Sequence, residues 1–130
     1  MKFATGTLLL MIFLIAAIGS LPGQDQDLSG TWIGSTVIPN MEEKDNLTLV
    51  LKKDGASYTG TITDSMGMLN AAVLEKVKLE KDTLSFEFLV LTSTEQIRVR
   101  STLKVTGDKL VGSWESEQGD TGALEMVRKK

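Results

Sequence analysis

The chain of 130 residues contains no cysteine and no histidine. Without cysteine a small domain has no disulfide framework, so its stability has to come from a well-packed core. Without histidine the Ser-His-Asp and Cys-His catalytic units and His-based metal sites are excluded. A phosphate-binding GxxxxGK loop is also missing. The sequence therefore predicts a protein that is not an enzyme and that carries no metal and no cofactor.

The chain has no excess of positive charge. Its 14 basic and 17 acidic residues give a formal net charge of −3. Charges of both signs are spread along the chain, and an acidic, mixed surface argues against binding to nucleic acid or to anionic membranes. No internal repeat or low-complexity segment is evident, and the length predicts a single small domain.

One long apolar run stands at the N-terminus. Lys2 precedes Leu8–Ile18, an unbroken apolar stretch, and small residues follow at Gly19, Ser20 and Gly23. This is the layout of a secretory signal peptide, whereas a spanning helix needs about 20 apolar residues. We expect a signal peptide over 1–23 (cleavage after about 19–23), a short linker over 24–29 and one domain over 30–130. The protein is then exported, to the periplasm or outside the cell, without a stable membrane anchor after processing; a permanent anchor is the alternative.

After residue 29 the chain reads as consecutive strands. Apolar and polar residues alternate, and turn residues recur about every ten positions, which is typical of an all-β sandwich or barrel. Because every connection is short, neighbouring strands pair antiparallel, and eight such strands can close into an up-and-down (meander) barrel without sheet edges. A sandwich of two sheets is the alternative. The predicted strands cover Gly30–Ile38, Asn46–Lys52, Tyr58–Asp64, about Ala71–Glu80, Leu84–Val90, Ile97–Val105, Leu110–Trp114 and Gly122–Arg128.

The fourth predicted strand breaks the alternation. The face that carries Val77 and Leu79 would also carry Glu75, and a buried, unpaired carboxylate is costly. A β-bulge near Glu75–Lys76 would turn Ala72 and Leu74 inward instead. We prefer the bulge to a regular strand.

The two ends of such a barrel differ. One end holds tight turns, and the other holds two longer loops that bring methionines to the rim. Methionine is favoured at adaptable apolar binding surfaces. We expect a ligand site in the lumen and at this open rim, formed by Ile38, Met41, Ile62, Met66, Met68, Phe88, Val90, Ile97 and Trp114.

Polar residues on the inward faces complete this expectation. Thr36 and Ser101 are the candidates for orienting a ligand head group. The charged segment Met41–Asp45 is expected to be a solvated loop, and Glu87 is expected to face solvent. A filled core is the alternative to a ligand site, and an interior volume below about 100 Å³ would favour it, since ligand pockets usually reach about 300 Å³ or more.

Trp32 and Arg128 are expected to seal the other end. If the barrel closes, the first and last strands are neighbours, and the alternation places both side chains at the end with the tight turns. A guanidinium over an indole face is a favourable pairing, worth about 0.5 to 2 kcal/mol. We therefore predict a structural plug made by these two residues.

The chain resembles the lipocalin-like (calycin) barrels. "GTW" at Gly30–Trp32 and "VRK" at Val127–Lys129 match the Gly-x-Trp of the first strand and the Arg of the last strand of that group. Over about residues 28–130, segments such as "LSGTWIGS", "LTLVLKKDG" and "VTGDKLVGSW" are similar to the accessory β-barrel that precedes the catalytic domain of some secreted bacterial α/β-hydrolases. The resemblance implies a small lipocalin-like barrel without the catalytic half of such hydrolases. From the alternation of the strands and the methionine rim, we expect an exported, non-catalytic barrel that binds a small apolar or amphipathic ligand at its open end.

A second resemblance, to the avidin family, is weaker. "GST" at Gly34–Thr36 and "GTITDS" at Gly60–Ser65 are similar to the first and third strands of the avidin family. Ile62 stands where an aromatic hydroxyl is expected, and the chain has only two Trp and one Tyr. Biotin binding is therefore not expected.

Exposed apolar residues support a different function. Apolar side chains on an outer face can mark an interface with a protein partner. The alternative is thus a filled barrel that acts as a protein-interaction module, for example with an envelope enzyme. The outward apolar residues are Val50, Leu89, Leu91 and Val111.

Overall fold

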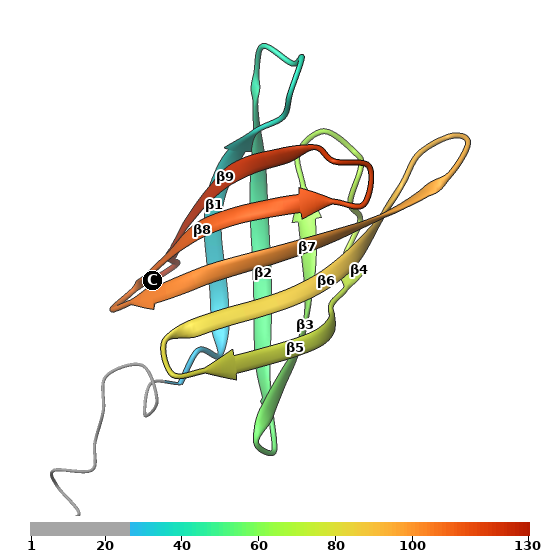
Figure 1. The fold of residues 1–130 in the computed structure, drawn as a ribbon. Helices are drawn as coiled ribbons and strands as arrows, with labels where there is room; N and C mark the ends of the chain where they lie inside the picture. The colour runs from blue at the N-terminus through green and yellow to red at the C-terminus, as the bar shows by residue number, and fades with distance from the viewer. Residues whose placement is uncertain (1–26) are drawn as a thin grey trace, which may run out of the picture.

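The structure is a computed structural model that describes residues 27–130. This part of the chain is all-β and forms an antiparallel, up-and-down, nearly closed barrel, as predicted (Figure 1). No helix in it is long and apolar enough to cross a membrane. The signal peptide expected at 1–23 lies outside the described residues.

Nine strands follow one another around the barrel in the order β4-β3-β2-β1-β9-β8-β7-β6-β5. The first strand pairs with the last, as expected, and Trp32 lies opposite Arg128. The strands are β1 (Gly30–Val37), β2 (Lys44–Asp54), β3 (Ser57–Asp64), β4 (Ala72–Val73), β5 (Glu75–Glu80), β6 (Thr83–Leu91), β7 (Gln96–Thr106), β8 (Lys109–Ser116) and β9 (Thr121–Arg128).

The count of nine, rather than the predicted eight, comes from the expected fourth strand. This segment changes partners along its length: β4 pairs with β3, and β5 pairs with β6. The register shifts between Glu75 and Lys78, and Lys76 has a φ of 51°. Leu74 is buried at the junction, where its N–H donates to Gly60 O over 3.0 Å. The bulge predicted near Glu75–Lys76 is confirmed, and it joins the two ends of the sheet.

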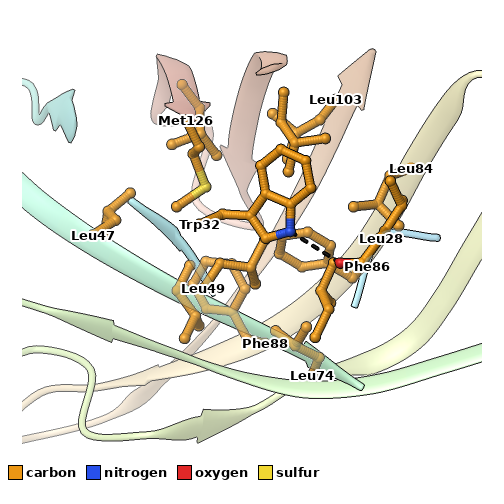
Figure 2. Packing of buried hydrophobic residues seen from close by; sticks show 14 of the residues in the cluster. Leu28, Trp32, Leu47, Leu49, Leu74, Leu84, Phe86, Phe88, Leu103 and Met126 are labelled. Carbon is orange, nitrogen blue, oxygen red and sulfur yellow. Dashed lines mark hydrogen bonds between the residues drawn. The ribbon is translucent and has the colours of Figure 1, made fainter. Parts of the chain in front are cut away.

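Part of the core packs around Trp32 at the end with the tight turns. The indole is fully buried, and Figure 2 shows it among Leu28, Leu49, Phe86 and Met126. All of these side chains come from inward positions of strands or from the segment before β1. The alternation of apolar residues therefore accounts for the core.

The expected contact between Trp32 and Arg128 is present. The guanidinium carbon lies 4.3 Å from the centre of the indole ring. Its Nη1 donates to Ser29 O over 2.9 Å and its Nη2 donates to Asp27 O over 3.1 Å. Arg128 thus fastens the segment before β1 over the end of the barrel.

That segment belongs to the packed domain. Leu28, expected to lie in the linker, is fully buried. Its carbonyl accepts a hydrogen bond from Trp32 Nε1 over 3.0 Å, and its N–H donates to Tyr58 Oη over 3.0 Å. The described part of the expected linker thus packs against the closed end of the barrel and supplies the partner of the indole N–H.

Glu87 was expected to face solvent, but it is largely covered. Its side chain points outward but is only 8% exposed, because long basic side chains cover it. Its carboxylate lies 3.2 Å from Arg98 Nη1, 3.4 Å from Arg100 Nε and 3.9 Å from Lys76 Nζ. These ion pairs tie β6 and β7 to the bulge.

We expect Trp32→Ala to lower the free energy of unfolding by about 3–5 kcal/mol, the usual cost of truncating a buried large aromatic residue. Chemical denaturation followed by circular dichroism measures this change. Ile33→Ala, on the exposed side of the same strand, should cost about 1 kcal/mol or less. Equal midpoints for the Trp32 variant and the parent would show that the indole does not hold the closed end.

Candidate functional site

A cavity of about 150 Å³ opens at the end of the barrel opposite Trp32. The longer loops after β1, β3, β6 and β8 surround this end (Figure 1). The cavity walls come from inward positions of β1, β2, β3, β6, β7, β8 and β9, so the cavity is the continuation of the core that side chains do not fill. Its volume exceeds the limit of about 100 Å³ below which a filled core would be favoured.

Most of the side chains predicted for the site line this one cavity. Those that do are Ile38, Ile62, Met68, Phe88, Val90, Ile97 and Trp114. Two do not. Met41 is 44% exposed, on a turn where its N–H donates to Ile38 O over 3.0 Å, and Met66 is half-buried in the loop after β3. Leu69, from the same loop, contributes to the wall instead.

Trp114 forms one side of the cavity in a fixed orientation. Its ring lies against Gly122, where a Cβ would come within 2.6 Å of Nε1. Nε1 donates to Thr36 Oγ1 over 2.8 Å, and Thr36 Oγ1 donates in turn to Ala123 O. The Thr36 hydroxyl therefore holds the indole in place and is not available to orient a head group.

The hydroxyl of Ser101, unlike that of Thr36, has no hydrogen-bond partner among the described residues. Ser101 lines the cavity and is fully buried. Apolar residues occupy the neighbouring inward positions of the same strand, Val99 and Leu103. A buried hydroxyl without a partner costs free energy. This hydroxyl is thus the inward polar group best suited to contact a ligand.

Three carboxyl groups that were not predicted there line the cavity, and two of them, Asp45 and Asp64, lie together. Asp45 was expected in a solvated loop, but β2 begins at Lys44, and the alternation that buries Leu47 and Leu49 also buries Asp45 to 2% exposure. Asp64 is the next inward residue after Ile62 at the end of β3. The sequence does contain a signal for Asp45. The inward residues Leu49 and Leu47 are spaced by two, and Asp45 is the next residue in that series.

Hydrogen bonds from the loop after β3 hold both carboxyl groups. Asp45 Oδ1 accepts from the N–H and from the Oγ of Ser65, each over 3.2 Å. Asp64 Oδ1 accepts from Leu69 N–H over 2.9 Å. Asp64 Oδ2 is buried and has no hydrogen-bond partner among the described residues. One carboxylate oxygen is therefore left for another donor.

The Asp64 carboxyl disturbs the ionisation of Asp45. Burial, together with the hydrogen bond and the charge of the neighbouring Asp64 carboxyl, raises the pKa of Asp45 to about 6, against the lowering effect of the hydrogen bonds from Ser65. Asp120 also lines the cavity, and none of the described residues that line it is Lys or Arg. Within 27–130, no group of three or more His, Cys, Asp or Glu is arranged to hold a metal ion.

The outward apolar residues do not form one surface. Leu89 and Leu91 line a groove of about 360 Å³ with Val73, beside the junction of β4 and β5. Val50 lies on β2, and Val111 lies level with Lys104 and Thr83, at the far end of β6 from Leu91. The four residues of the predicted interface are therefore scattered, and only two of them share a groove.

We expect the stability difference between the parent protein and Asp45→Asn to depend on pH. The raised pKa means that the folded state holds this proton more tightly than the unfolded chain. The group therefore destabilises the fold above about pH 6, and the parent gains stability relative to the variant as the pH falls from about 7 to about 4, by up to about 3 kcal/mol.

Thermal denaturation of both proteins at a series of pH values measures this difference. Asp54→Asn, which removes an exposed carboxylate from the other end of the same strand, is the control for net charge. Parallel curves for the parent and Asp45→Asn would contradict the prediction.

Comparison of the chain with protein-family models, with curated proteins and with solved structures finds no match in any of the three. The structure thus establishes a small antiparallel barrel, and the lipocalin-like identity stays a prediction.

Proposed function

We propose that this protein is an exported, non-catalytic barrel that binds a small apolar or amphipathic ligand in the cavity at its open end. The observation that carries the proposal is the cavity itself, about 150 Å³ in volume, walled by apolar side chains and containing the unpartnered hydroxyl of Ser101. An engineered protein cavity of about 150 Å³ with similar apolar walls binds benzene.

The volume limits the ligand. Sites for drug-sized molecules usually measure about 300–1,000 Å³, so this cavity takes an apolar group of about the size of benzene. The remainder of a larger ligand would extend through the mouth, past Ile38, Val90 and Ile97, which are all half-buried. A long acyl chain would not be enclosed.

The chemistry of the cavity supports binding rather than catalysis. Ser101 is the one hydroxyl in the described wall without a hydrogen-bond partner, and no base lies within hydrogen-bond reach of it. A serine nucleophile needs such a base. The apolar run Leu8–Ile18 supports export to the periplasm or beyond the cell.

A second candidate is docking of a protein partner in the outer groove. Val73 is 69% exposed and Leu91 is 59% exposed, both unusual for large apolar side chains. This groove becomes the better candidate if the cavity binds nothing.

We expect the purified protein to bind benzene and hexanol with dissociation constants of about 0.1–1 mM, as such small ligands allow. Ligand-observed NMR titration measures this affinity. Ile97→Trp should abolish binding by filling the mouth of the cavity. Val111→Trp adds the same side chain to the outer face of β8 and should bind as the parent does. Absence of binding to the parent protein would refute the proposal.

A further inference from the structure

We propose that the ligand is an amphipathic primary amine, whose apolar group fills the cavity and whose ammonium group binds between Asp45 and Asp64. This inference rests on the proposed function, since the apolar group occupies the same cavity. It adds the charge and the class of the head group.

The carboxyl groups are placed for this role by the strand register. Leu47 pairs with Asp64 across β2 and β3, and Asp45 is the next inward residue toward the rim. Both aspartates therefore stand beyond the apolar wall, where a ligand whose apolar end lies inside the barrel would present its polar end. Both line the cavity.

The hydrogen bonds at these groups leave room for one more donor group. Ser65 supplies two donors to Asp45 Oδ1 and Leu69 supplies one to Asp64 Oδ1. Asp64 Oδ2 is buried without a partner in the described protein. An ammonium group has three N–H donors and no acceptor, so it can bond this oxygen and the second oxygen of Asp45 together. A carboxylate or phosphate head group can do neither.

The charged residues around the mouth of the cavity also favour a positively charged head group. Asp45 on β2, Asp64 on β3 and Asp120 in the loop before β9 are the titratable groups that line the cavity. Among the described residues, neither Asp45 nor Asp64 forms an ion pair with a Lys or Arg within 4.0 Å. A pair of close carboxyl groups without a counter-ion holds a proton that a cation can replace. A fatty-acid carboxylate would instead be repelled.

Ser101 gives an independent indication of a polar ligand. It is fully buried, it lines the cavity, and its hydroxyl has no partner in the described protein. A hydrocarbon ligand cannot form a hydrogen bond with this hydroxyl, and the unpaired hydroxyl destabilises the fold. A ligand with a hydrogen-bonding atom removes that cost.

The test uses three probes that share a phenyl ring and differ in the head group: phenethylamine, phenylethanol and phenylpropionate. At about pH 7 we expect phenethylamine to bind the purified protein about tenfold more tightly than phenylethanol, and phenylpropionate to bind more weakly than both. Calorimetric or NMR titration measures the three affinities. At about pH 5, where Asp45 holds its proton, the advantage of phenethylamine should be lost and the affinity for phenylethanol kept.

Variants identify the groups responsible. Asp64→Asn and Asp45→Asn should each reduce the affinity for phenethylamine to about the affinity of the parent protein for phenylethanol. Asp54→Asn, remote from the mouth but equal in charge change, should bind as the parent does. If one variant fails to fold by circular dichroism, the other variant and the pH series still decide.

The outcomes separate this inference from the proposed function. Equal binding of phenethylamine and phenylethanol by the parent protein overturns the amine proposal and leaves the apolar site standing. Stronger binding of phenylpropionate also overturns it. If none of the three probes binds, both the inference and the proposed function are wrong.

Discussion

Trp32 lies where the first strand of the barrel meets the last, and the closed end is built around its indole ring. Arg128 covers one face of the ring, and the indole N–H reaches back to the carbonyl of Leu28. The two ends of the described chain, which are distant in sequence, are joined at this point. A chain without cysteine must join its sheet edges by noncovalent contacts alone. Buried apolar side chains surround the indole at this end, whereas the cavity lies at the opposite end.

The alternation of apolar and polar residues predicts consecutive antiparallel strands, with a barrel preferred to a sandwich. Short connections leave few topologies for such strands, so counting positions places Trp32 and Arg128 at the same end, and the structure pairs them directly. The alternation does not predict that one strand divides in two. Glu75 signals the bulge, but the change of partner from β3 to β6 depends on how the barrel closes in three dimensions. The alternation also misses Leu28, because it lies outside any strand.

The site is only partly predictable for the same reason. Side chains on strands, such as Ile62 and Phe88, have their direction set by the backbone and are assigned to the cavity from sequence. Loop residues have no such constraint, and Met41 turns to solvent while Leu69 turns inward. Asp45 was missed because a charged residue beside a loop is ordinarily solvated. Only its spacing of two residues from Leu47 distinguishes it, and the register that places Asp64 opposite Leu47 brings the two carboxyl groups to the same part of the rim.

The position of the chain ends has a practical consequence for how the molecule can be presented. Asp27 and Lys130 both lie by the tight turns, at the end of the barrel sealed by Trp32 (Figure 1). A tag or a surface joined to either end of the described chain is therefore attached at the closed end of the barrel. The mouth of the cavity lies at the opposite end of the barrel from both ends of the described chain. Immobilisation through either end should leave the opening facing solution.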